Sequence, residues 1–327
     1  MKLPSPDSLT DFMAMFDTEE ACEDYLYALR WPEGFVCPKC ESTRKPYWIR
    51  SQRKVECGDC GEQTYLTADT IFHKTHTPLK TWFLAAYLVT THTPGISAVQ
   101  LQRQLGLTRY ETAFQILHKL RAAMVNPERQ KLHGVVEVDE TFIGGDVAKT
   151  HGGRSPTGKN IVVGAVEQRH NKSLREARRG RTTVAGRVRM RVIPDTTAKS
   201  LVPFVQDHVE PDSVVLTDAW NGYARLGSKG FQHEPIVNAA LKLIHLEFSN
   251  LKTWLQGTHH GRVEEQHLQA YVNEFCFRHN RRFWPFTAFQ TVLRIGMHQE
   301  PQEYEELYEA EGQGEGVHVR GFEEYDP

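Results

Sequence analysis

The stretches VVEVDET at residues 135–141 and SVVLTDAW at residues 213–220 decide the fold that this sequence predicts. Each is rich in β-branched residues and leads to an aspartate, Asp139 in the first and Asp218 in the second. A short apolar run bounded by polar residues is typical of a strand that is buried on both faces of a sheet. An isolated aspartate at a strand end is most often a turn or cap residue. The order of the surrounding elements therefore decides whether the two carboxylates meet.

That order is typical of one α/β architecture. Strands are predicted at residues 135–141, 161–167, 187–194 and 213–218, and a helix at 197–209. The order β-β-β-α-β, followed by a further helix, is that of a ribonuclease-H-like fold, in which the first and fourth strands lie side by side. This fold would place Asp139 next to Asp218, where two carboxylates could hold the divalent ions of a phosphoryl-transfer site. Residues 144–160, rich in glycine and polar residues, are predicted to form a flexible loop.

Four of the six cysteines form two CxxC pairs separated by sixteen residues. The pairs are Cys37 with Cys40 and Cys57 with Cys60. Each CxxC turn supplies two thiolates from one tight knuckle, and two such turns complete the tetrahedral ligand set of a structural zinc ion. The segment between them carries five basic residues and alternates like a hairpin. The sequence therefore predicts a zinc ribbon, a module that binds nucleic acid or protein, and no disulfide framework.

Helices are predicted on both sides of the ribbon. The first thirty residues show apolar positions every three or four residues, and three helices follow between residues 78 and 124. The last two surround a turn at Gly106, with Thr108 as the expected N-cap of the second, which is the layout of a helix-turn-helix. Such pairs also occur in bundles that do not bind DNA, but the neighbouring basic ribbon favours DNA. The side chains expected to reach bases or phosphates are Arg109, Tyr110, Thr112 and Gln115.

Charge is unevenly distributed along the chain. The formal net charge is −2, yet the residues from Glu300 onward include ten acidic residues and one basic residue. The remainder holds 38 basic and 31 acidic residues, a net charge of +7. Basic residues cluster at 171–191 and 277–282, which indicates a polyanionic partner, and Arg281 and Arg282 are candidates for lining a DNA groove.

The sequence predicts five regions and a cytoplasmic location. No apolar stretch of about eighteen residues occurs and the N-terminus lacks an export signal, so no membrane association is expected. The predicted regions are N-terminal helices (1–30), a zinc ribbon (31–70), a helix-turn-helix-like DNA-binding region (71–128), an α/β catalytic domain (132–298) and an acidic, disordered tail (299–327).

A further ligand for the two aspartates is expected from the helix predicted at residues 241–261. His245, Ser249 and Lys252 are spaced i, i+4 and i+7 and share one face of that helix. Glu247 and Asn250 point elsewhere. The spacing thus identifies the helix but leaves the ligand open.

Several longer motifs resemble those of a known family. These motifs are EVDETFIGG, LTDAWNGY, SNLKTWLQGTHHG and HLQAYVNEFCFRHNRR, preceded by CPKC, CGDC and TADTIFHKTHTPLKTWF. They are similar to the zinc-ribbon-bearing ISXO-like group of bacterial insertion-sequence transposases, and the similarity runs from about residue 15 to residue 296. The resemblance implies a DDE-type transposase that uses Mg2+ or Mn2+ to cleave transposon ends and join them to target DNA, as a dimer or higher assembly.

The resemblance also implies roles for individual residues. Asp139 and Asp218 match the first two acidic positions of the family. The third position, a Glu or Asn seven residues before a Lys, corresponds to His245, and Lys252 would contact phosphate near the scissile bond. Imidazole suits Mn2+ better than Mg2+, because hard cations prefer oxygen ligands. If neither His245 nor the alternative ligand Asn250 binds metal, the copy is inactive.

Two other functions fit the same pattern. One is a DNA-binding protein without catalytic activity, descended from a transposase. The other is a ribonuclease-H-like nuclease that acts on RNA or on DNA junctions. The two intact strand-end carboxylates favour the active transposase.

Overall fold

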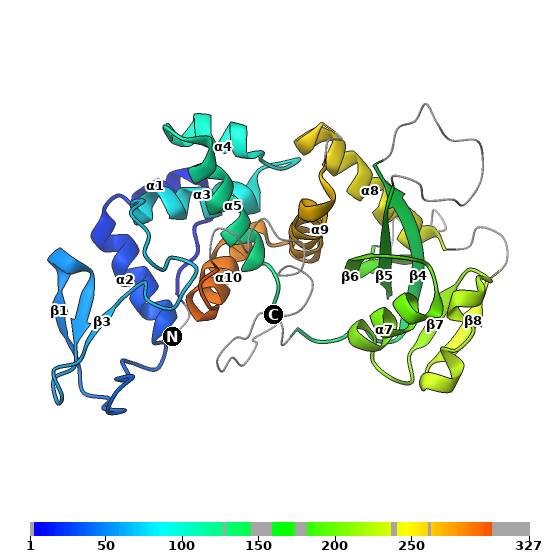
Figure 1. Cartoon of the computed structure of the whole chain (residues 1–327), viewed down its shortest axis with the longest axis horizontal. Helices are drawn as coiled ribbons and strands as arrows, with labels where there is room; N and C mark the ends of the chain where they lie inside the picture. Colours follow the sequence, from blue (N-terminus) through cyan, green and yellow to red (C-terminus); the bar gives the residue numbers. More distant parts are fainter. Residues whose placement is uncertain are drawn as a thin grey trace. The chain divides into compact units, whose positions relative to one another are not determined.

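The computed structural model describes residues 3–126, 129–144, 159–173, 182–236, 241–260 and 263–302. The chain forms two compact units, whose helices and strands are labelled in Figure 1. The first unit consists of Met1–Glu128 together with Arg281–Pro327, and the second of Arg129–Asn280. Three predicted features lie largely or partly outside the described residues: the loop at 144–160, the basic cluster at 171–191 and the acidic tail at 299–327.

Helices of the first unit pack around aromatic side chains. They are α1 (Leu9–Met15), α2 (Glu19–Arg30), α3 (Leu79–Thr91), α4 (Ala98–Leu105), α5 (Tyr110–Ala122) and α10 (Pro285–His298). The Phe289 ring of α10 packs on those of Phe16 and Phe83, with centroids 5.6 and 5.8 Å apart. This burial joins α10 to the N-terminal helices, although the catalytic domain was expected to continue to residue 298. No helix in the described part of the chain is both long and apolar enough to cross a membrane.

A three-stranded antiparallel sheet follows α2. Its strands, in spatial order, are β1 (Tyr47–Ile49), β2 (Lys54–Glu56) and β3 (Gln63–Tyr65). Val55 at its centre is fully buried and belongs to one apolar cluster with Phe35, Cys37 and Cys57. The hairpin thereby brings the second CxxC pair against the first.

The α4–α5 pair has the expected turn but a later second helix. Gly106 ends α4 in the left-handed conformation, with φ of 63°, which glycine adopts without a steric cost. The residue at the N-cap of α5 is Arg109, and no side chain caps this helix. The prediction of Thr108 as the N-cap is therefore wrong, because the helix begins one residue later than the hydroxyl would require.

The second unit is an α/β domain with a mixed five-stranded sheet. Its strands are β4 (Val135–Ile143), β5 (Asn160–His170), β6 (Thr183–Ile193), β7 (Val214–Thr217) and β8 (Gln232–Pro235). Their order in the sheet is β6-β5-β4-β7-β8. The strand β5 runs antiparallel to both of its neighbours, β4 and β6, whereas β7 runs parallel to both β4 and β8. The expected pairing of the first and fourth strands is confirmed, and β8 is an additional edge strand that the sequence did not reveal.

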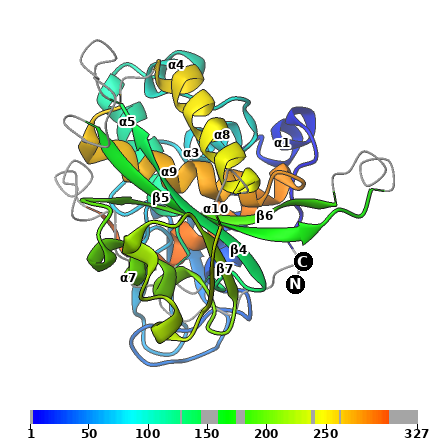
Figure 2. The ribbon, with the colours of Figure 1, turned by 90° about the vertical axis from the view of Figure 1, so that its right-hand side faces the viewer.

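Helices cover both faces of this sheet (Figure 2). One face packs on α7 (Ala198–His208), and the other on α8 (Lys242–His259) and α9 (Glu265–Asn280). Neighbouring residues of β5 divide accordingly, since Val163 belongs to the α7 core and Val162 to the α8–α9 core. Burial on both sides explains why β5 reads as a continuous apolar run.

A buried ion pair joins β5 to β6. Glu167 Oε1 lies 2.6 Å from Nη2 of Arg187, and the same carboxylate accepts a hydrogen bond from the backbone amide of His133. Burial alone would raise the pKa of Glu167, but the hydrogen bonds and positive charge of Arg187 outweigh it and lower the pKa to about 2. The pair therefore contributes to stability as long as the carboxyl stays ionised.

Candidate functional site

Parallel pairing of β4 with β7 places Asp139, in the middle of β4, near the end of β7, which Asp218 directly follows. Glu137 of β4 is in register with Leu216 of β7. Asp139 and Asp218 each follow that register pair by two residues. The negative charge of Asp218 acts on Asp139 strongly enough to contribute to its pKa. The structure thus brings together the two carboxylates that the sequence singled out.

His245 reaches this site from the first turn of α8. Its Nε2 lies 2.8 Å from Oδ2 of Asp139, whose side chain is 14% exposed. Burial raises the pKa of Asp139, and the charge of Asp218 raises it further, against the lowering effects of the Glu140 amide and of His245. Partly buried carboxylates that repel each other favour a bound cation.

Asp218 is held by the turn that follows β7. Its Oδ1 accepts a hydrogen bond from the backbone amide of Trp220 at 3.0 Å. The buried Tyr223 then donates its hydroxyl to Oε2 of Glu140 at 2.8 Å. Because Glu140 adjoins Asp139, this bond ties the Asp218 turn to the neighbouring strand.

The remaining candidates on α8 divide between its faces. Lys252 is close enough to Lys159 to feel its charge, and burial followed by this charge lowers the pKa of Lys252. Two neighbouring cations would favour binding of a phosphate. Asn250 donates instead to Glu247 at 3.3 Å, and Glu247 lies 3.0 Å from His279 of α9. The amide of Asn250 is thus engaged with the α8–α9 contact, whereas His245 contacts Asp139.

Asp139, Asp218 and His245 could hold a metal ion together as an open ligand set. Two carboxylates and an imidazole suit Mn2+, and the carboxylates also suit Mg2+. Among the described residues, the four cysteines alone bring three or more possible ligand atoms within 4.8 Å of one another. The acidic residues therefore do not form a closed cluster of the kind that the four cysteines form.

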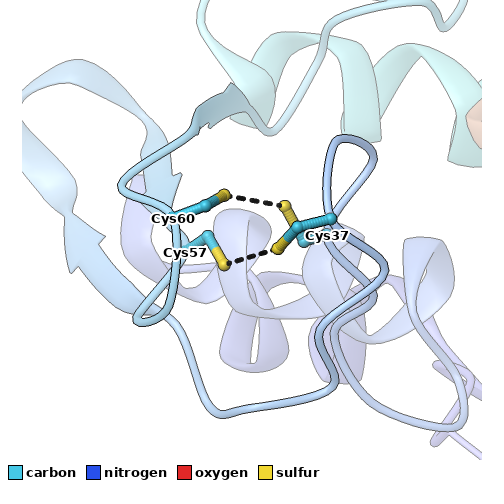
Figure 3. Close-up of side chains that lie close together, drawn as sticks. Cys37, Cys57 and Cys60 are labelled. Carbon is cyan, nitrogen blue, oxygen red and sulfur yellow. Dashed lines mark hydrogen bonds between the residues drawn. The ribbon is translucent and has the colours of Figure 1, made fainter.

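The cysteine cluster has the dimensions of a zinc site. The Sγ atoms of Cys37 and Cys60 are 3.7 Å apart, and so are those of Cys40 and Cys57 (Figure 3). A tetrahedron with Zn–S bonds of about 2.3 Å has edges of about 3.8 Å. The backbone amides of Asp59 and Cys60 lower the pKa of Cys57 to about 6, which favours the thiolate that binds metal. Against the lowering effect of the Ser42 amide, the neighbouring thiols raise the pKa of Cys40 to about 12. The four thiols thus fit a tetrahedral zinc ion.

The residues predicted to contact DNA from the first unit differ in accessibility. Arg109 and Tyr110 at the start of α5 are exposed, whereas Thr112 and Gln115 are half-buried. Arg282 is exposed and its guanidinium lies 4.6 Å from the ring centroid of Phe283, and Arg281 is half-buried. Of these six residues, the most accessible to DNA are therefore Arg109, Tyr110 and Arg282.

Sequence reasoning missed Glu137, Gly164 and Tyr223, which surround the acidic site. Glu137 lies two residues before Asp139, so strand alternation places both on the face that α8 covers. That spacing was the available signal for Glu137. Tyr223 ends the motif LTDAWNGY, but its contact with Glu140, like the contact of Gly164 with α8, arises from tertiary packing.

Comparison with known proteins identifies both units. Residues 131–280 match the ISXO2-like transposase domain, and residues 17–63 match the transposase zinc-ribbon domain. Together these matches cover more than half of the chain, and both are domains of transposases. The family resemblance inferred from the motifs is thereby confirmed.

A similar protein from a transposable element agrees with these domain matches. The chain is 28% identical over 130 residues to an uncharacterised protein of the transposable element ISH50 from Halobacterium salinarum. The similarity covers 39% of this chain and 43% of that protein. The chain thus spans less than half the length of this curated relative.

Proposed function

We propose that this protein is an insertion-sequence transposase that cleaves the ends of its element and joins them to target DNA. The observation that carries the proposal is the meeting of Asp139, Asp218 and His245 in a domain of the ISXO2-like transposase family. The mixed sheet, with β4 beside β7 and helices on both faces, supports a ribonuclease-H-like fold for this domain.

Metal ions bound to this site would activate a water or a 3′-hydroxyl and stabilise the leaving oxygen in phosphoryl transfer. Asp139 and Asp218 would hold these ions between them, and His245 would complete the ligand set from α8. The hydrogen bonds from Trp220 to Asp218 and from Tyr223 to Glu140 would hold both carboxylates in place. Lys252 would contact a phosphate beside the scissile bond.

DNA recognition is assigned to the first unit and to the basic residues of the second. A zinc ion bound by the four cysteines would keep the ribbon folded, and Arg109 and Tyr110 would contact the transposon end from the start of α5. Phosphate contacts make such binding fall steeply with salt concentration. Two ends must be joined together, so a dimer or higher assembly on DNA is proposed.

The test uses the full chain with labelled transposon-end DNA. Asp139→Asn and Asp218→Asn should each abolish cleavage and joining, at least about a thousandfold, because each removes ligand charge with little change of shape. DNA binding should persist. Asp207→Asn is a matched control, since Asp207 is an exposed carboxylate on α7 that pairs with Arg191. Cleavage at the wild-type rate by either site variant would refute the proposal.

One observation favours a second candidate function. The third ligand position holds His245, which is a poorer ligand for Mg2+ than a carboxylate. A DNA-binding protein that has lost catalysis would therefore bind transposon ends without cutting them in either Mg2+ or Mn2+. The same assay separates the two functions, and inverted repeats with a short target duplication around the coding sequence would favour the transposase over a nuclease.

A further inference from the structure

The first turn of α8 is capped by a carboxylate from the sheet. Glu137 of β4 is 1% exposed, and its Oε2 accepts hydrogen bonds from the backbone amides of Leu243 at 2.9 Å and Ile244 at 3.0 Å. Its other oxygen accepts from Nε2 of Gln168 at 2.8 Å. The N-cap residue of α8 itself, Leu241, makes no side-chain cap. Glu137 thus satisfies amides that would otherwise lack partners and places a negative charge at the positive end of the helix.

A glycine lets the same helix lie close on the sheet. Gly164 of β5 is in register with Asp139 on the neighbouring strand. A Cβ atom at Gly164 would come within 2.7 Å of Phe248 Cε1 and 2.9 Å of Ile244 Cδ1. Both side chains belong to α8, so they occupy the space that any larger residue at position 164 would fill.

Together these contacts fix where His245 points. Glu137 binds the amides of the two residues before His245, and Gly164 receives the side chain of Ile244. Each residue of a helix is rotated by about 100° from the one before, so rotation of α8 by one residue would carry the imidazole away from Asp139. The observed separation of 2.8 Å between His245 Nε2 and Asp139 Oδ2 depends on that rotation.

We propose that Glu137 is a positioning residue of the active site, which acts through α8 to hold His245 at Asp139. Gly164 provides the close approach that this requires. The inference rests on the proposed function, because it treats His245 as a metal ligand. One β-strand would then supply a ligand, Asp139, and orient a second ligand from a helix 106 residues further along the chain.

The experiment combines amide exchange with metal binding in the full chain. In metal-free protein, Glu137→Ala should speed hydrogen exchange at Leu243 and Ile244 about tenfold or more, because hydrogen bonds to a charged acceptor are lost. Mn2+ affinity, measured by calorimetry, should fall about tenfold or more, as it does when residues that orient a ligand are removed. Glu137→Gln should reduce the Mn2+ affinity less, since its amide oxygen can still accept hydrogen bonds from both N–H groups. Gly164→Ala should also weaken Mn2+ binding.

A control and a double variant separate positioning from general destabilisation. Glu167→Gln also removes a buried carboxylate of this sheet but should leave Mn2+ affinity unchanged, since Glu167 pairs with Arg187. If Glu137 acts through His245, adding Glu137→Ala to His245→Ala should cause little further loss. Two results would overturn the inference. One is an additive loss of Mn2+ affinity in the double variant, and the other is unchanged amide exchange at Leu243 and Ile244 in Glu137→Ala. Absence of Mn2+ binding by the wild type would instead refute the metal assignment of the proposed function, and amide exchange would still decide whether Glu137 caps α8.

Discussion

The four-cysteine cluster and the acidic site obtain their ligands in opposite ways. The four cysteines come from residues 37–60, and two tight turns and a short hairpin suffice to bring their thiols together. Asp139 and His245 are separated by 106 residues and meet because β4, β7 and α8 pack in one domain. The cysteine site is closed by its own ligands, whereas the acidic site is open. Zinc would therefore stabilise a local structure, while a catalytic ion depends on the whole fold of the second unit.

Removing zinc should have the largest effect, and it should be local. Cys57→Ser leaves three thiolates, so the ribbon should lose its fold and the full chain should fall below about one zinc per molecule. The second unit should remain folded, because none of these ligands belongs to it. Metal analysis and amide exchange along the chain would measure both results. Cys22→Ser, which changes a cysteine outside the cluster, is the control. If the ribbon stayed folded and protected from exchange without metal, its fold would not depend on zinc.

Breaking the Glu167–Arg187 pair should have the next largest effect, confined to the second unit. Glu167→Ala leaves the Arg187 charge buried and unpaired, at a cost of about 3–5 kcal/mol in unfolding free energy. The ribbon should keep its zinc. Urea denaturation would measure the loss, and Glu264→Ala, which removes a carboxylate that is 76% exposed, should have little effect.

The same pair predicts how stability depends on pH. The pKa of Glu167 is lowered in the folded protein from 4.5 to about 2, so its contribution is fully present above pH 4.5 and disappears as the pH falls toward 2. The contribution amounts to about 3 kcal/mol. Glu167→Gln should remove this part of the acid dependence. An unchanged slope in the variant would show that the ion pair is not responsible.

Changing the third ligand should have a smaller effect, on metal preference. His245→Glu supplies an oxygen ligand, so the ratio of Mg2+-supported to Mn2+-supported joining should rise about tenfold. Ser249→Glu adds a carboxylate one turn further along the same face of α8 and serves as the control. Equal ratios in His245→Glu and the wild type would argue against His245 as a ligand and would direct attention to Asn250.

A single sequence reveals features with local signals better than features that depend on contacts between distant segments. The CxxC spacing, the apolar runs of β4 and β7, and the helix near 197–209, observed as Ala198–His208, were predicted because their signals are local. Helical spacing placed His245 on the same face as Lys252, and the family resemblance matched His245 to the third ligand position. The strand β8, with sequence QHEP, was missed because a polar edge strand has no apolar alternation. The packing of α10 into the first unit and the capping of α8 by Glu137 depend on contacts between distant segments.

Local backbone cleavage would test most directly whether Asp139, Asp218 and His245 form one metal site. Fe2+ can replace Mn2+ in such ligand sets, and with peroxide and ascorbate it generates hydroxyl radicals that cut the nearby chain. In zinc-loaded wild-type protein, we expect cuts near all three of Asp139, Asp218 and His245, and their loss in Asp139→Asn. Cuts that persist in Asp139→Asn, or that omit the segment around Asp218 or His245, would contradict the claim that the fold assembles these residues into one metal site.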